Sequence, residues 1–189
     1  TMYVGVYLGS NTLEYWNVTD GKAETLVGKS ELPMYKVTGT DNTMTLTIPY
    51  GIYTSGRFIF SEKDKMSCTV NADGSVNFPT ASTEKNVYDF VEFTMSAAAK
   101  GNYSLNINTT TVDQFGFPIK VVTNPADPNV PNGIGINVSR ATAINDFKSA
   151  YDQTAFSPCV LSDDDAPDSV RRVLAPHHTI DKYLKDSPS

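Results

Sequence analysis

The segment that decides the fold lies near the middle of the chain and mixes aromatic, β-branched and acidic residues: Val87-Tyr88-Asp89-Phe90-Val91-Glu92-Phe93-Thr94-Met95. This composition is typical of a β-strand, in which successive side chains point to opposite faces of a sheet. Glu92 then shares a face with Tyr88, Phe90 and Thr94, and the opposite face is also largely apolar. We therefore predict a strand over residues 87–95 that carries a partly desolvated glutamate.

Similar patterns extend outward from this segment, from residue 3 to about residue 122. Thr, Val, Tyr, Phe and Ile are abundant there and are interrupted by Gly, Asn, Asp and Pro, which favours short strands joined by turns. The predicted strands cover residues 3–8 and 13–18, which form a hairpin, and also residues 43–48, a segment from residue 57, and residues 103–112. Short strands at this spacing predict a β-sandwich or β-barrel.

The pattern changes after residue 123. Residues 124–133 are rich in Pro and Gly, which indicates an exposed connection, and residues 143–151 carry Ile144, Phe147 and Tyr151 at helical spacing. We therefore predict a mainly β domain over residues 1–123, followed over residues 124–189 by a connection and the start of a smaller helical region.

Composition restricts the function. The 189 residues have 40% hydrophobic content, enough for one ordinary domain, and the net charge of -6 disfavours nucleic-acid binding. The apolar runs are far shorter than the roughly 20 residues of a transmembrane helix, so no membrane span is expected. The first residues lack the pattern of a signal peptide, so we expect that one has been removed or that the chain is a fragment.

No metal or cofactor is expected. The two histidines, His177 and His178, are adjacent, and neighbouring side chains on a strand or helix point apart, which disfavours a shared ion. The two cysteines, Cys68 and Cys159, lack the spacing of a zinc site, and the sequence leaves open whether they form a disulfide.

Glu92 and Asp113 are the candidate catalytic carboxylates. Desolvation of Glu92 suits a general acid, whereas the structural alternative is a buried glutamate paired with a basic residue. Asp113 follows a predicted strand and precedes a Gly and Pro turn, where it either accepts hydrogen bonds from the backbone or serves as a base. Two carboxylates in one cleft are the usual machinery of glycoside hydrolysis.

Five short motifs in chain order resemble those of glycoside hydrolase family 64, the β-1,3-glucanases, and more loosely the plant thaumatin-like proteins. They are Thr45-Leu46-Thr47-Ile48-Pro49, Ser55-Gly56-Arg57-Phe58-Ile59-Phe60-Ser61, Glu92-Phe93-Thr94, Thr111-Val112-Asp113-Gln114-Phe115-Gly116-Phe117-Pro118-Ile119 and Arg172-Val173-Leu174-Ala175-Pro176.

This resemblance implies a thaumatin-like β-sandwich or barrel beside a small, incomplete α-containing region, with an acidic groove for β-1,3-glucan. It implies an inverting hydrolysis with Glu92 as general acid and Asp113 as general base. Thr94 and Ser96 take the positions of sugar contacts, although Ser96 is smaller than the polar residue that glucanases often carry there. Arg57 matches a basic position near the thaumatin-like cleft and would contact substrate there; the alternative is a surface arginine at a strand edge. The same resemblance implies a secreted protein.

The chain also departs from the family. Family members are much longer and continue after the segment that resembles residues 172–176. We therefore expect that the chain is a fragment, that a second polypeptide completes the groove, or that the chain is a reduced relative. Two other functions stay open: a noncatalytic thaumatin-like module that binds glucan or protein, and a structural or assembly protein that reuses the fold.

Overall fold

The computed structural model describes residues 1–39, 43–79, 85–109, 113–123, 128–129, 133–152, 154, 156–163 and 166–179. The chain folds into two compact units. The first comprises residues 1–79 and 90–108, and the second comprises residues 80–89 and 109–189. The predicted boundary at residue 123 stays a prediction, because units of compact packing need not be independently folding domains.

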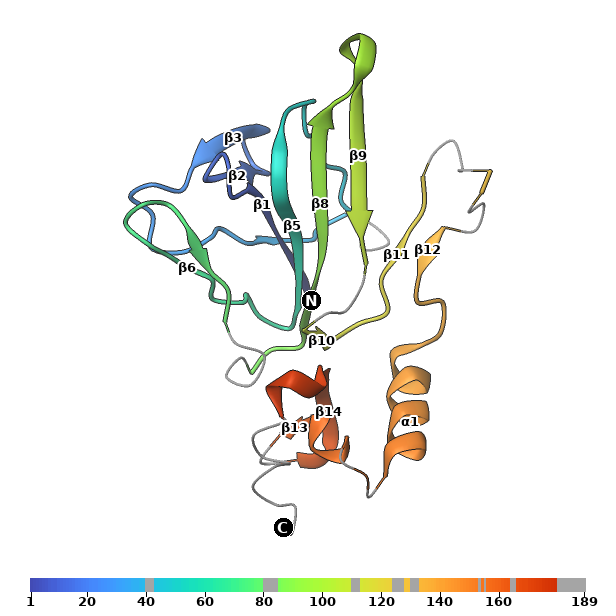
Figure 1. The fold of residues 1–189 in the computed structure, drawn as a ribbon. Coiled ribbons are helices and arrows are strands. Elements are labelled where there is room, and N and C mark those ends of the chain that lie inside the picture. The colour runs from blue at the N-terminus through green and yellow to red at the C-terminus, as the bar shows by residue number, and fades with distance from the viewer. Residues whose placement is uncertain are drawn as a thin grey trace. The chain divides into compact units, whose positions relative to one another are not determined.

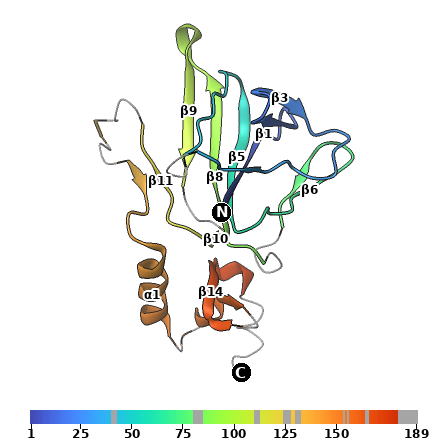
Figure 2. The same cartoon turned by 180° about the vertical axis from the view of Figure 1, so that it is seen from behind.

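A seven-stranded sheet forms the first unit, with the strand order β3-β2-β1-β5-β8-β9 and with β4 also paired to β1 (Figure 1). The strands are β1 (Met2–Gly9), β2 (Glu14–Asn17), β3 (Lys22–Thr25), β4 (Tyr35–Lys36), β5 (Tyr53–Glu62), β8 (Tyr88–Ala97) and β9 (Tyr103–Asn108). A 3₁₀ turn, η2 (Ala99–Gly101), joins β8 to β9, which pair in antiparallel fashion. Figure 2 shows β9, β8, β5 and β1 of this sheet from behind.

The core of this unit comes from alternate residues of the central strands. The buried residues that pack together are Val4, Val6, Leu8, Trp16, Tyr53, Phe93 and Met95. Their spacing in β1 and β8 is the period of two expected when one face of a sheet is buried. The predicted mainly β fold and the N-terminal hairpin of β1 and β2 are therefore confirmed.

The prediction of a strand over residues 43–48 is wrong. The burial of this segment does alternate as predicted, and Met44, Leu46 and Ile48 pack against the core. The segment nevertheless belongs to no assigned strand. Alternation of side chains requires an extended backbone, whereas a strand also requires a hydrogen-bonded partner. A separate short hairpin of β6 (Thr69–Val70) and β7 (Val76–Asn77) completes the described part of the unit.

The second unit contains short strands and one α-helix. A three-stranded sheet has the order β10-β14-β13, from β10 (Gln114–Phe115), β13 (Val160–Asp163) and β14 (Ala166–Leu174). A further pair consists of β11 (Lys120–Val121) and β12 (Ile134–Gly135). The 3₁₀ turns η3 (Ser157–Cys159) and η4 (Pro176–His178) lie before β13 and after β14. The small hydrophobic core of this second unit contains Ile144, Cys159 and Val173.

Helix α1 (Arg140–Tyr151) confirms the predicted helix but begins three residues earlier. Its N-cap is Ser139, whose Oγ accepts a hydrogen bond from the backbone N–H of Thr142 at 3.1 Å. Arg140 anchors the first turn, because its guanidinium donates to the carbonyl oxygens of Gly116 at 2.6 Å and Val170 at 2.9 Å. The helix is therefore held by side-chain contacts with backbone carbonyls as well as by apolar packing.

None of the helices within the described ranges has the length and apolar character needed to cross a bilayer. Both cysteines are buried, Cys68 in the first unit and Cys159 in the second.

Candidate functional site

A polar face of the first unit carries most of the predicted site residues. In the antiparallel pair of β8 and β9, Glu92 lies opposite Asn108 and Thr94 lies opposite Asn106. Residues directly opposite in such a pair project from the same face of the sheet. The intervening residue Phe93 points to the other side, where it belongs to the core. Period-two alternation thus gives this part of the sheet one apolar and one polar face.

Glu92 is held by an ion pair with Arg57 of the neighbouring strand β5. Its Oε1 atom accepts hydrogen bonds from Nε of Arg57 at 3.0 Å and from Nη2 at 2.8 Å. The side chain of Arg57 is 21% exposed and that of Glu92 is 33% exposed, so the pair is only partly solvated. The other carboxylate oxygen, Oε2, accepts no hydrogen bond from the described residues.

Two aromatic rings fix the guanidinium of Arg57. Its central carbon lies 4.3 Å from the ring centroid of Phe78 and 4.4 Å from that of Phe90, distances typical of cation–π contacts. Tyr7, directly opposite Arg57 in the β1–β5 pair, is close enough to be affected by this charge. Burial raises the pKa of Tyr7, and the positive charge of Arg57 opposes that rise. The two rings and the carboxylate of Glu92 therefore hold the guanidinium of Arg57 in place on the polar face of the first unit.

A small cavity of about 130 Å³ opens beside this ion pair. All but one of its lining residues are polar: Ser55, Glu92, Phe93, Thr94, Asn106 and Asn108. Its volume is well below the roughly 300–1,000 Å³ of an enclosed small-molecule pocket. The cavity is thus suited to contacts with hydroxyl groups of a larger ligand rather than to enclosing a ligand whole.

The expected surroundings of Glu92 need correction. The alternation within residues 87–95 predicts an apolar environment, yet the adjacent strands supply Arg57, Asn106 and Asn108. The structural alternative, a glutamate paired with a basic residue, is what the structure contains. The physical reason is that the surroundings of a side chain on a sheet include side chains of the neighbouring strands as well as those of its own strand.

Of the residues predicted to contact sugar, Thr94 lines the polar cavity and Ser96 does not. Thr94 lines the cavity, and its Oγ1 accepts a hydrogen bond from the backbone N–H of Ser55 at 3.4 Å. Ser55 has a φ of 54°, a left-handed conformation within strand β5. Ser96 lies further along β8, opposite Ser104, where it is exposed and does not line the cavity. The structure therefore groups Thr94 and Arg57 with Glu92, and leaves Ser96 at the periphery of the polar face.

Asp113 belongs to the second unit, where it lies beside two histidines. The Nε2 atoms of His177 and His178 are each 3.8 Å from Oδ1 of Asp113. The expectation that adjacent histidines point apart is wrong, since their ring centroids are only 3.9 Å from one another. An imidazole carries its Nε2 atom well beyond Cβ, so side chains that leave the backbone in different directions can still converge at their tips.

Within the described ranges, these three residues are also the group best placed to hold a metal ion. One potential ligand atom from each of Asp113, His177 and His178 lies within 4.8 Å of the others. Backbone pairing creates this arrangement, because the N–H of Ala175 donates to the carbonyl oxygen of Asp113 at 2.8 Å, directly before η4 begins.

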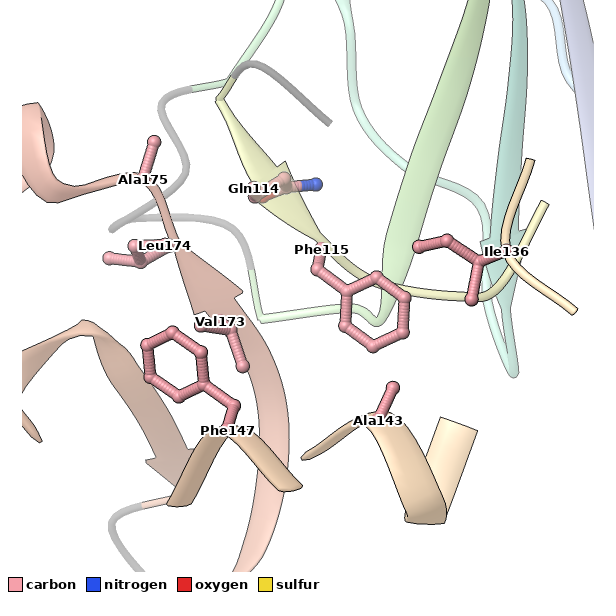
Figure 3. A pocket seen from close by; sticks show the side chains of 8 residues that line it. All are labelled: Gln114, Phe115, Ile136, Ala143, Phe147, Val173, Leu174 and Ala175. Atoms are coloured by element: carbon pink, nitrogen blue, oxygen red, sulfur yellow. The ribbon is translucent and has the colours of Figure 1, made fainter. Parts of the chain in front are cut away.

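A larger, apolar cavity of about 290 Å³ lies within the second unit (Figure 3). Helix α1 contributes Ala143 and Phe147, and β14 contributes Val173 and Leu174. The polar lining residue Gln114 is already engaged, since its amide donates to the carbonyl of Tyr88 at 2.8 Å and accepts from Arg172 at 3.0 Å. This cavity therefore offers packing space and little polar recognition.

Sequence reasoning missed Ser55, Asn106 and Asn108 as lining residues of the polar cavity. A signal for the asparagines was present, because polar residues alternate with Leu105 and Ile107 in β9. The alternation over residues 103–112 predicts a strand, but it does not identify Glu92 as a neighbour of that strand. For Ser55, the left-handed backbone that directs its N–H toward Thr94 has no comparable sequence signal.

Solved structures of a glycoside hydrolase are similar in fold to this chain. A laminaripentaose-producing β-1,3-glucanase of glycoside hydrolase family 64 from Paenibacillus barengoltzii, complexed with laminarihexaose, is similar at a TM-score of 0.65 and 20% identity. A second structure of that enzyme, described without the oligosaccharide, gives a TM-score of 0.57 and 18% identity. In both comparisons the match covers 93% of this chain and 44% of the other, so the chain spans less than half of the enzyme.

Among proteins with curated descriptions, none matches the chain. The family model described as β-1,3-glucanase, glycoside hydrolase family 64, matches residues 5–187. That range contains all five motifs of the predicted resemblance, which is thereby confirmed. The chain belongs to glycoside hydrolase family 64, the β-1,3-glucanase family.

Proposed function

We propose that this chain takes part in the hydrolysis of β-1,3-glucan, with Glu92 as general acid and Asp113 as general base of an inverting reaction. The observation that carries the proposal is the polar cavity beside Glu92, in a chain of a β-1,3-glucanase family. The P. barengoltzii enzyme complexed with laminarihexaose supports the choice of ligand class. A polymeric glucan does not cross membranes, so we also propose that the protein acts outside the cell.

The surroundings of Glu92 suggest how it would donate a proton. Arg57 donates both of its hydrogen bonds in this pair to Oε1, which leaves Oε2 to carry the proton and to approach the glycosidic oxygen. The amides of Asn106 and Asn108 and the hydroxyl of Thr94 line the same cavity and are suitable partners for sugar hydroxyls. Binding of the sugar beside Glu92 would also exclude water, which favours the neutral form of a carboxyl group.

Asp113 would activate the attacking water. Its side chain is 43% exposed, so water can reach the carboxylate. In an inverting enzyme the two carboxyl groups lie about 6.5–9.5 Å apart, with the water and the sugar between them. The base then accepts a proton from water while the acid protonates the leaving oxygen.

Glu92→Gln and Asp113→Asn test these roles with laminarin as substrate. Each variant should reduce the release of reducing ends by about 10²–10⁴-fold, the usual contribution of a positioned acid or base. Asp146→Asn, on the exposed side of α1, is the matched control and should retain full activity. Proton NMR of the first product should show the anomer opposite to that of the substrate linkage. Undiminished hydrolysis by Glu92→Gln would refute its assignment as the acid.

A second candidate function is a noncatalytic glucan-binding module. One observation favours it: Arg57 donates two hydrogen bonds to Oε1 of Glu92, a pairing that also serves a purely structural role. This function predicts that the chain retains laminarin on a column or in a pull-down while releasing no oligosaccharides. Loss of retention in Asn106→Ala, together with an absence of products from the wild-type chain, would select the binding module over the enzyme.

A further inference from the structure

We propose that Asp113, His177 and His178 form a binding site for a zinc ion. The proposal rests on the geometry of the second unit and does not depend on glucan hydrolysis. The two histidines, which are the only ones in the chain, converge on one carboxylate oxygen.

The fold assembles this cluster from two distant parts of the chain. Strand β10 pairs with β14 so that Gln114 lies opposite Leu174, and the pairing continues through the contact between Asp113 and Ala175. The chain then turns through η4, which begins at Pro176 and contains both histidines. The hydrogen bond from the His178 N–H to the carbonyl of Ala175, at 3.0 Å, fixes this turn. The backbone positions of all three residues are therefore set by hydrogen bonds outside their side chains.

The distances within the cluster suit metal ligands better than hydrogen-bonded partners. Each Nε2 atom is 3.8 Å from Oδ1 of Asp113, beyond the roughly 3.2 Å limit of a good N–H to O hydrogen bond. Around a tetrahedral zinc ion with bonds of about 2.0–2.1 Å, neighbouring ligand atoms are about 3.4 Å apart. A contraction of about 0.4 Å would bring each nitrogen–oxygen distance to that spacing, and rotation of the two imidazoles, whose ligand atoms lie within 4.8 Å of one another, would adjust the distance between the nitrogens.

The donor set indicates the kind of ion. Two neutral imidazole nitrogens and one carboxylate oxygen form a set that zinc accepts, with a fourth position left for water. Imidazole favours zinc and related transition metals over the hard cations Mg²⁺ and Ca²⁺. The side chains are 57% exposed at His177, 27% at His178 and 43% at Asp113. An ion can therefore enter from solvent, and water can complete its coordination.

Isothermal titration of the metal-stripped 189-residue chain with zinc chloride tests the site. We expect one zinc ion per chain, with no saturable binding of magnesium chloride. His177→Ala, His178→Ala and Asp113→Asn should each weaken zinc binding by about 100-fold, since even partners outside the coordination sphere can contribute 10–100-fold. Asp146→Asn removes an exposed carboxylate of the same unit and should leave zinc affinity unchanged.

A spectroscopic measurement distinguishes coordination from loose ionic attraction. Cobalt(II) added to the wild-type chain should give visible absorption bands of a nitrogen- and oxygen-ligated ion, and His177→Ala should abolish them. Either of two results would overturn the proposal: no saturable zinc binding by the wild-type chain, or zinc affinity that is the same in the wild type and all three ligand variants. Glucan hydrolysis is not measured in these experiments, so their outcome is separate from that of the proposed function.

Discussion

Replacement of Arg57 by methionine tests the central contact of the polar face. Arg57→Met keeps an unbranched side chain of similar length between Phe78 and Phe90 but removes the charge and the donors. Glu92 would then lose both hydrogen bonds to Oε1, at 3.0 and 2.8 Å, while still being only 33% exposed. The first unit should become less stable because this carboxylate would have no compensating partner.

The expected size of the effect follows from the burial of the pair. Hydrogen bonds to charged groups contribute about 1.5–3 kcal/mol when buried, whereas exposed ion pairs contribute about 0.2–1 kcal/mol. The side chains of Arg57 and Glu92 are 21% and 33% exposed, which lies between full burial and full exposure, so solvent screens part of their interaction. We therefore expect a coupling energy of about 1–2 kcal/mol between Arg57 and Glu92. The single change Arg57→Met should cost about 2–3 kcal/mol, because the cation–π attraction to the two rings is lost as well.

A double-mutant cycle isolates the coupling. The wild type, Arg57→Met, Glu92→Gln and the double variant are unfolded in urea and followed by fluorescence of Trp16, the single tryptophan, which is buried in the same unit. The exposed pair Lys22 and Asp20, 3.7 Å apart, is the matched control and should give a coupling of about 0–0.5 kcal/mol. A coupling for Arg57 and Glu92 no larger than that of the control would refute the reasoning.

Two further changes test other parts of the fold. Gly116→Ala should destabilise the second unit by more than about 2 kcal/mol, because the added Cβ would overlap the backbone carbonyl of Tyr88. Hydrogen exchange of the backbone amides in α1 and β14 measures this loss of stability. Amides of the variant that are protected as well as those of the wild type would contradict the prediction. The hydrogen bond from the hydroxyl of Tyr15 holds the pKa of Glu24 at about 2, below its ordinary value of 4.5. A lowered pKa in the folded state stabilises the fold above the unfolded-state value, so stability should fall as the pH drops from about 4.5 to about 2. Glu24→Gln should remove this part of the pH dependence in urea titrations, and an unchanged profile would contradict the assignment.

Local alternation was sufficient to predict much of the first unit. A period of two in the side chains of residues 87–95 places Glu92 and Thr94 on one face without knowledge of any other strand. The hairpin of β1 and β2 was also predictable, because its turn residues lie between two apolar alternating segments. These features depend on residues close together in the chain, and so the sequence contains the necessary information.

Contacts between distant segments were not predictable in this way. The partner of Glu92 is Arg57, 35 residues away, and no periodicity within β8 identifies β5 as its neighbour. The convergence of His177 and His178 on Asp113 likewise depends on the pairing of β10 with β14. A short motif can identify residue types that occur together in a family. It does not specify the side-chain geometry that decides whether a carboxylate is paired, hydrated or placed beside a potential metal ligand.

Asp113 connects the two proposals and makes them antagonistic. A carboxylate bound to zinc keeps other lone pairs, but the positive charge of the ion lowers its basicity, so it would accept a proton from water less readily. If both proposals hold, zinc should inhibit glucan hydrolysis and a chelator should restore it. His177→Ala should then weaken inhibition by zinc while retaining Asp113 as the base. Zinc binding would thus regulate the general base and not take part in hydrolysis.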